Sequence, residues 1–350
     1  MSTMTEPTED YLWDKSGTPD SEIERLESLL TQFRSESQQP VWIHSPLLYR
    51  VERSSAKRFW LSAALALAAL ALVTVTLAIR ARFEWRPGDP WKVVALNGSP
   101  RIAGSFVKNR ADFSVGQALV TDAASRARIR VASLGVVDVE PGSRVRLVAT
   151  HATRHQIALD YGTISARMWA PPFSLAVDTP SASLFDLGCA FTLHVESGGY
   201  GTVYVTSGWV EFETSSRSVI IPAGAEAVTR PELGPGTPYF SDATPALKIA
   251  VSGFDSHPKD DSVRAMALES VLANARSHDA LTLLSLLNRV PLPKRAVVLD
   301  RLVAFVPIPD GYSREAVLNL HTDAMDAYWA ALHLGSPKNW LMNWKDVLIY

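Results

Sequence analysis

An uninterrupted apolar stretch is the feature of this sequence that most limits what the chain can fold into. No charged residue lies among the 21 residues from Phe59 to Ile79. As an α-helix they would measure roughly 31 Å, close to the thickness of about 30 Å of a bilayer's hydrocarbon core. A buried core helix rarely runs so far without a polar face, and a cleaved signal peptide would lie nearer the start of the chain. The stretch therefore predicts one transmembrane helix at residues 59–79 and makes the membrane an expected partner.

The charges around the predicted span do not decide its orientation. Four basic residues lie close to it on each side: Arg50, Arg53, Lys57 and Arg58 before it, and Arg80, Arg82, Arg86 and Lys92 after it. The number of basic residues is therefore equal on the two sides, and the positive-inside rule gives no orientation. Long domains, moreover, cross a membrane largely regardless of charge. The orientation has to come from another observation.

Composition excludes several kinds of partner and site. Lys and Arg number 34 against 36 Asp and Glu, a formal net charge of −2, so no global positive field would attract nucleic acid. We therefore expect no nucleic-acid partner. Cys189 is the one cysteine of the sequence. It cannot form an intrachain disulfide or a zinc site of paired thiolates.

Residues 1–58 precede the span as a short tail with one predicted amphipathic helix. Thr18 is the expected N-cap and Pro19 the first helical residue. The apolar side chains of this helix form one stripe, a candidate partner-binding surface made of Ile23, Leu26, Leu30 and Phe33. A helix of about fifteen residues is marginal alone, so the stripe is expected to pack on the rest of the tail, on another copy of the chain or on a partner protein. A half-formed, solvent-exposed tail is the alternative that the pattern leaves open.

A β domain is predicted at residues 91–230, after a juxtamembrane connector at residues 80–90. Short runs rich in Val, Ile, Phe and Thr alternate apolar with polar residues, as between Val203 and Glu213. This pattern is typical of a many-stranded domain, either a β-solenoid or a β-sandwich. Glycines recur between the runs, and we expect structural turns at Gly142, Gly162, Gly188, Gly208 and Gly224.

The rest of the chain is predicted to be a linker followed by helices. Four prolines between residues 231 and 245 argue against a continuing β ladder, so residues 231–257 are expected to form a Pro-rich linker. From Asp260 the apolar residues repeat at helical spacing, and residues 258–350 are predicted to be an all-α C-terminal domain. Its later helices are expected at residues 278–289, 294–305 and 313–334.

Several motifs follow one another in the β segment in a characteristic order. They are Thr179-Pro180 at the end of a strand-like run, then Leu187-Gly188-x-x-Phe191, then Val205-x-x-Gly208-x-Val210. Together with the flanking runs "LDYGTISARM" and "IPAGAEA", they resemble the FecR family of bacterial envelope regulators. The resemblance covers roughly 140 residues, about two-fifths of the chain.

The resemblance implies a topology and a regulatory role. Members of this family usually hold the β domain outside the cytoplasmic membrane, behind one transmembrane helix and a cytoplasmic tail that can bind a sigma factor. We therefore expect an inner-membrane protein with a cytoplasmic N-terminus and periplasmic C-terminal domains, whose partners are a cytoplasmic sigma factor and an envelope protein. The tail is shorter than the family's usual anti-sigma domain, and the C-terminal part is helical, so the resemblance does not extend to iron sensing.

No motif of this sequence predicts an enzyme, a cofactor or a metal site. Phosphate-binding, nucleophile-elbow and zinc-protease motifs do not occur. His151 and His155 have the spacing of helical metal ligands, but on a strand about 13 Å would separate them. Cys189 has no evident catalytic partners and is expected to be a small buried side chain. The leading function is an anti-sigma-like regulator; the alternative is a membrane-anchored scaffold with no role in transcription.

Overall fold

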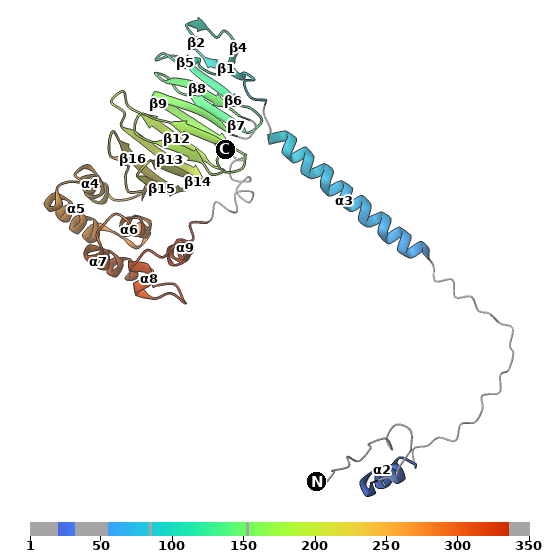
Figure 1. Cartoon of the computed structure of the whole chain (residues 1–350). Helices are drawn as coiled ribbons and strands as arrows, with labels where there is room; N and C mark the ends of the chain where they lie inside the picture. Colours follow the sequence, from blue (N-terminus) through green and yellow to red (C-terminus); the bar gives the residue numbers. More distant parts are fainter. Residues whose placement is uncertain (1–19, 32–54, 84–85, 152–153, 336–350) are drawn as a thin grey trace, which may run out of the picture. The chain divides into compact units, whose positions relative to one another are not determined.

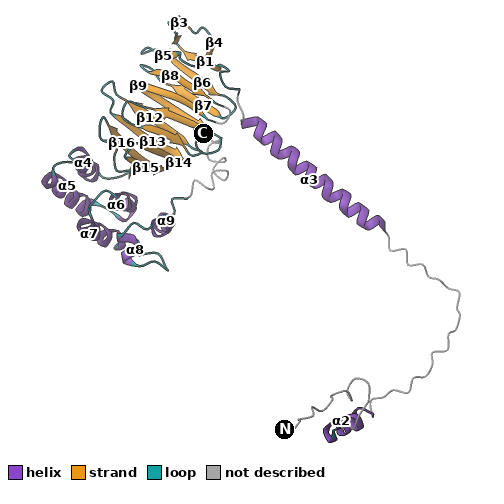
Figure 2. Cartoon of the chain, viewed as in Figure 1, coloured by secondary structure: helices purple, strands orange, loops and turns teal. Residues whose placement is uncertain are grey.

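The computed structural model describes residues 20–31, 55–83, 86–151 and 154–335. Its contacts divide the chain into two compact units, Met1–Leu67 and Ala68–Tyr350, and each is described by itself. The second unit holds the described strands and the C-terminal helices (Figure 1, Figure 2).

The elements are mostly short. The strands are β1 (Trp91–Asn97), β2 (Arg101–Ile102), β3 (Ser105–Phe106), β4 (Arg110–Phe113), β5 (Ala118–Val120), β6 (Arg126–Val131), β7 (Gly135–Val139), β8 (Arg144–Thr150), β9 (His155–Met168), β10 (Leu175–Asp178), β11 (Ser183–Asp186), β12 (Ala190–Val195), β13 (Gly201–Ser207), β14 (Trp209–Thr214), β15 (Arg217–Pro222), β16 (Ala225–Arg230), β17 (Gly234–Pro235) and β18 (Tyr239–Phe240). The helices are α2 (Ser21–Thr31), α3 (Ser55–Phe83), α4 (Pro245–Ser256), α5 (Asp261–Asn274), the 3-10 helix η1 (Ser277–Asp279), α6 (Ala280–Leu287), α7 (Leu292–Val303), α8 (Arg314–Leu318) and α9 (Thr322–Ala331).

Two mainly antiparallel sheets form the β part. The first sheet runs in the order β4, β1, β6, β7, β9, β12, β13 and β16, with β17 and β18 beside β16. The second sheet runs in the order β3, β2, β5, β8, β9, β10, β11, β14 and β15. β9 pairs with β10 in parallel, and β9 belongs to both sheets.

The inward faces of the two sheets share one hydrophobic core. Along β13, buried residues alternate with more exposed ones, as the period-2 pattern of its sequence predicts. The core cluster includes Leu193 and Val203 from the first sheet, and Leu159 and Phe212 from the second. The prediction of a mainly β domain followed by helices is therefore confirmed, and the β part consists of two packed sheets.

β9 passes from the second sheet to the first at Gly162. Apart from Ala158, its buried side chains occupy odd positions before this residue and even positions after it: His155, Ile157 and Leu159, then Ile164, Ala166 and Met168. Gly162 has φ +98°, and a Cβ on it would lie 2.2 Å from Ser143 Oγ. We expected this glycine at a turn between strands, but it lies inside β9, where the strand changes sheets without reversing direction.

The other glycines expected at turns also have positive φ. The values are 68° at Gly142, 84° at Gly188, 70° at Gly208 and 79° at Gly224. Gly208 connects β13 to β14, and a Cβ on it would lie 2.3 Å from the carbonyl oxygen of Gly188. A side chain at residue 208 would have to displace backbone, so glycine is required there.

Residues 231–257, expected to be a Pro-rich linker, form regular structure instead. β17 and β18 pair with β16, and α4 begins at Pro245. This proline lies in the first turn of α4, where its missing N–H is not needed. Thr244 caps the helix, because its hydroxyl accepts a hydrogen bond from Leu247 N at 3.2 Å. Pro245, which was expected to interrupt regular structure, therefore lies at the start of a helix.

The C-terminal helices differ in their bounds from those that the sequence patterns predict. α5 begins after Asp260, whose carboxylate accepts hydrogen bonds from Ser262 N at 3.1 Å and Val263 N at 3.0 Å. The expected helix at residues 278–289 is η1 followed by α6, and the one at residues 294–305 is α7. The expected helix at residues 313–334 is interrupted at Leu320, where φ is +56°, and is divided into α8 and α9. The buried side chains of these helices form a second hydrophobic core.

α2 is the helix predicted in the N-terminal tail. Asp20 stands at its start, because the Asp20 carbonyl accepts hydrogen bonds from Ile23 N and Glu24 N at 3.0 and 3.1 Å. None of the side chains of α2 is buried. The expected cap at Thr18 and the first helical residue Pro19 lie outside the described residues.

α3 is 29 residues long and includes the predicted span at residues 59–79. Its side chains are described at residues 63–78, and its large aliphatic side chains are exposed there, Leu65 by 70% and Leu72 by 69%. Thr74 and Thr76 donate hydrogen bonds to the carbonyl groups of Ala71 and Leu72 at 2.9 and 2.7 Å. Over the described residues, no helix has the length and apolar character needed to cross a membrane.

Candidate functional site

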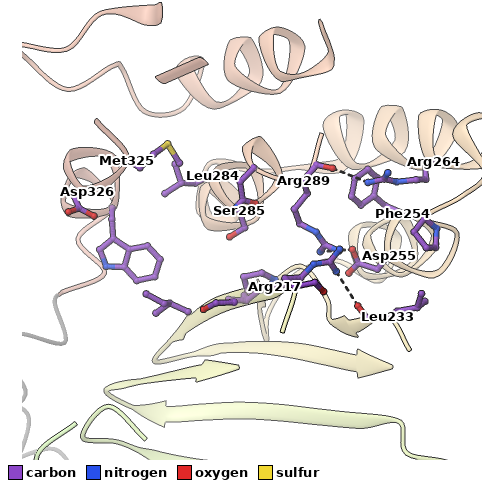
Figure 3. A pocket seen from close by; sticks show the side chains of 18 of the residues that line it. Arg217, Leu233, Phe254, Asp255, Arg264, Leu284, Ser285, Arg289, Met325 and Asp326 are labelled. Atoms are coloured by element: carbon purple, nitrogen blue, oxygen red, sulfur yellow. Dashed lines mark hydrogen bonds and ion pairs between the residues drawn. The ribbon is translucent and has the colours of Figure 1, made fainter. Parts of the chain in front are cut away.

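A large pocket lies where the end of the β part meets the C-terminal helices. Its volume is about 1240 Å³. β15 and the segment before α4 line one side, and α4, α5, α6 and α9 with their connections line the other (Figure 3). The sheet edge and the helices both contribute, so neither forms the pocket alone.

A buried ion pair stands at the wall of this pocket. Arg289 Nη1 lies 2.6 Å from Asp255 Oδ1, and the two side chains are only 7% and 4% exposed. Asp255 also accepts hydrogen bonds from Thr237 N at 2.7 Å and from Thr237 Oγ1 at 2.9 Å. The carboxylate is therefore well satisfied, and it ties the end of α4 to the segment that follows β17.

Two further arginines line the same pocket. Arg217 on β15 donates to the carbonyl of Pro235 at 2.9 Å. Arg264 on α5 donates through Nη2 to the carbonyl of Arg289 at 3.0 Å. The Nε atoms of Arg264 and Arg289 are buried and have no hydrogen-bond partner among the described residues. Two guanidinium donors of this pocket are thus left without an acceptor.

The surroundings of Arg289 in the pocket disfavour the charged form of its guanidinium group. Burial, together with the charges of Arg217 and Arg264, lowers the pKa of Arg289 to about 10, against the opposing effect of Asp255. One close carboxylate therefore does not fully compensate the cluster of guanidinium groups.

An apolar wall adjoins the arginines. Phe254 lies beneath two of them, with its ring centroid 4.4 Å from Arg264 Cζ and 5.7 Å from Arg289 Cζ. Leu284, Met325 and Trp329 continue the lining on the helical side. A site that combines guanidinium groups with an apolar wall suits a ligand that has both an anionic and an apolar part.

A second buried polar cluster lies inside the β part. Cys189 is fully buried, and its thiol donates to Asp186 Oδ1 at 2.6 Å. The same oxygen accepts hydrogen bonds from Gly188 N at 3.2 Å and Cys189 N at 3.0 Å, while Oδ2 has no partner among the described residues. Burial raises the pKa of Asp186 to about 7, and burial together with Asp186 raises the pKa of the thiol. The thiol is therefore held in its neutral form.

His151 and His155 lie in different surroundings. His155 is fully buried, its ring centroid lies 5.4 Å from that of Trp91, and its ring nitrogens have no described partner. Burial lowers its pKa to about 4, whereas His151 is exposed. Within the described ranges, no group of three or more His, Cys, Asp or Glu side chains could hold a metal ion.

The predicted partner-binding stripe lies on α2, in the other unit. Leu26 and Leu30 are 58% and 63% exposed and Ile23 is half-buried, while Phe33 lies outside the described residues. The pocket residues were not predicted as a site. Arg217, Arg264 and Arg289 are far apart in the sequence, and each stands in an ordinary strand or helix pattern, so no local signal marks them.

The fold and the pocket together define a two-sheet β module with a helical cap and a cavity between them. No protein-family model and no curated protein matches the chain. Two crystal structures of a candidate anti-sigma factor from Parabacteroides distasonis, at 1.65 and 2.50 Å resolution, are weakly similar, each with 16% identity and a TM-score of 0.32. The match covers 39% of this chain and 64% of that protein. It is compatible with the resemblance seen in the sequence and adds no argument of its own.

Proposed function

We propose that the chain is a single-pass envelope regulator that binds a cytoplasmic partner, such as a sigma factor, through α2. The observation that carries the proposal is the exposed apolar stripe of this helix. Leu26 and Leu30 are 58% and 63% exposed, and no residue of α2 is buried. An isolated helix of this length is marginal in water, and covering one leucine is worth about 1.5–3 kcal/mol, so a partner would both order the helix and bury the stripe.

In this proposal the uncharged stretch of the sequence at residues 59–79 holds the protein in the inner membrane. The described side chains of α3 offer leucines and valines all around the helix and no charge, which suits lipid better than water. The N-terminal tail is placed in the cytoplasm, and the β part with its helices in the periplasm, as the FecR resemblance of the sequence implies. The second unit then acts by binding, with the pocket as the entry point of a signal.

A two-hybrid assay of the full chain tests both the partner and the topology. One fragment of adenylate cyclase is fused to the N-terminus of the chain and the other to each sigma factor of the host. We expect a signal with one sigma factor, and Leu30→Asp should abolish it because a charge then interrupts the stripe. Ser28→Asp adds the same charge on the opposite face of α2 and should leave the signal intact.

A lack of signal with every sigma factor would remove the regulatory role. The alternative is then an anchored scaffold, which is favoured by the same exposure of α2, since an inert tail would also be unpacked. Deleting residues 2–56 separates the two. A scaffold should keep its envelope phenotype after the deletion, whereas a regulator should lose its effect on transcription.

A further inference from the structure

We propose that the pocket between β15 and the C-terminal helices binds a small amphiphilic carboxylate. Arg264 and Arg289 would hold the carboxylate group, and Phe254 and Leu284 would pack against the apolar body (Figure 3). Trp329, which also lines the pocket, would add to this apolar contact. The inference concerns the ligand of the second unit and does not depend on a sigma-factor partner.

The first support is the pair of unused donors. Arg289 is 7% exposed, and its Nη1 is committed to Asp255 and Thr237. Its Nε is buried without a partner, and so is the Nε of Arg264. A buried N–H without an acceptor costs about 1–3 kcal/mol, and donors attached to a charged group cost more. Both side chains line the pocket, so a carboxylate bound there would offer their guanidinium groups a further acceptor, and guanidinium groups bind carboxylates in matching planar geometry.

The second support is the charge of the lining. Four basic side chains face three acidic ones: Arg217, Lys259, Arg264 and Arg289 against Glu232, Asp255 and Asp326. The excess is one positive charge, and Asp255 is already used by Arg289 and Thr237. A monoanion would therefore balance the pocket, whereas a dianion would overcompensate it.

The third support is the size and apolar character of the rest of the lining. The volume of about 1240 Å³ is ample for a small molecule, because ligand pockets are commonly about 300–1,000 Å³. Trp329 is half-buried and is held in place by a hydrogen bond from its indole N–H to Gly335 O at 2.9 Å. Together with Leu284 and Met325 it offers an apolar surface opposite the guanidinium groups.

The test compares a charged probe with a neutral probe of the same shape. The full chain in lipid nanodiscs is titrated calorimetrically with 4-phenylbutyrate and with 4-phenylbutanol, and empty nanodiscs give the blank. We expect the acid to bind about tenfold more tightly than the alcohol, or better, because only the acid accepts hydrogen bonds from both arginines with a full charge.

Three variants locate the binding. Arg264→Gln should weaken 4-phenylbutyrate about tenfold and leave 4-phenylbutanol almost unchanged. Ser285→Trp fills the pocket from α6 and should abolish binding of both. Arg314→Gln removes an arginine that pairs with Asp300 outside the pocket, at 2.7 Å, and should bind both probes as the unmodified chain does.

Equal affinity for the acid and the alcohol would overturn the proposal, as would absence of binding at millimolar acid. If Ser285→Trp fails to fold, Arg264→Gln decides, and unchanged affinity of this variant for the acid refutes the assignment. Binding that appears only after residues 336–350 are removed would also refute it, since the occupant would then be a segment of the chain itself.

Discussion

Asp186 is the side chain whose ionisation should most affect the stability of the β part. Its folded pKa is raised to about 7 by burial, so the folded state holds the proton more tightly than the unfolded chain does. The stabilisation is complete below the unfolded pKa of about 4 and is lost as the pH rises through about 7. We expect urea unfolding followed by near-UV circular dichroism to show a loss of roughly 3 kcal/mol between pH 5 and pH 8.

Asp186→Asn should remove most of that pH dependence, because an amide does not ionise while its oxygen can still accept the N–H groups of Gly188 and Cys189. Asp112→Asn is the matched control, since Asp112 pairs with Lys92 on the surface and is 57% exposed. If Asp186→Asn unfolds with the same pH dependence as the unmodified chain, the buried carboxyl group is not the cause.

Arg289 makes the opposite kind of contribution, because it neutralises a buried charge. Arg289→Met would leave Asp255 buried without its ion-pair partner, and we expect the free energy of unfolding to fall by roughly 3–5 kcal/mol. The double variant Arg289→Met with Asp255→Asn should recover much of this loss, since no buried charge remains. Chemical denaturation of both proteins measures the difference, and equal stability of the single and double variants would contradict the explanation.

An exposed pair provides the comparison. Arg314 pairs with Asp300 at 2.7 Å, and the two side chains are 39% and 65% exposed. Arg314→Gln should change stability by less than about 1 kcal/mol, because solvent screens the pair.

At the scale of single elements, Gly162, where β9 passes from one sheet to the other, is the position least tolerant of a side chain. Gly162→Ala should lower stability by roughly 2–5 kcal/mol, because a Cβ adds a collision with Ser143 to the strain of positive φ. Gly116→Ala separates the two effects, since Gly116 has φ +86° and open space around it, so only the strain remains. Thermal unfolding of both variants measures the difference, and equal losses would show that the collision is relieved.

Local patterns predicted the elements better than their connections. The sequence predicted the alternation in β13 and β14 and the start of α5 at Asp260, because each of these signals lies within a few residues. Pro245 was misinterpreted because proline is compatible with both a linker and a helix start, and only the packing of α4 decides between them. The crossing of β9 between sheets was not predicted, since strand pairing is set by distant partners.

The pocket could not be predicted for the same reason. Arg217, Arg264 and Arg289 come from a strand, a helix and a loop, and each is typical of a solvated surface in its own segment. Cys189 was correctly expected to be buried, but its partner Asp186 was missed, because an aspartate in a strand-like run gives no sign that it faces the core.

At the scale of the whole second unit, the helical segment is fastened to the sheets at both ends. α4 follows β18 directly, and beyond α9 the carbonyl of Leu334 accepts a hydrogen bond from Trp209 Nε1 at 2.8 Å. Gly335 packs on the same indole, where a Cβ would lie 2.5 Å from the ring. Trp209 thus holds the end of the helical segment against β14.

Trp209→Phe should loosen that end without unfolding the sheets. We expect amide hydrogen exchange to become about fivefold to tenfold faster in α9, corresponding to about 1 kcal/mol for one lost hydrogen bond, with little change in β12 and β13. Trp169→Phe is the control, because its indole donates to Ser133 O at 3.0 Å within the β part. Faster exchange across all strands in Trp209→Phe would mean that the indole supports the β core instead.

The passage of β9 from one sheet to the other has a consequence for how this chain can vary. Side chains alternate between the two faces of a strand, so a deletion or insertion of one residue near Gly162 would shift this alternation in one half of β9 relative to the other. The core-facing side chains of one half would then point outward. A change of length in a hairpin loop such as that between Thr214 and Arg217, which joins β14 to β15, leaves the alternation within both strands unchanged. Among natural variants of this protein, gaps should therefore collect in such loops, and the fourteen residues of β9 should keep their number.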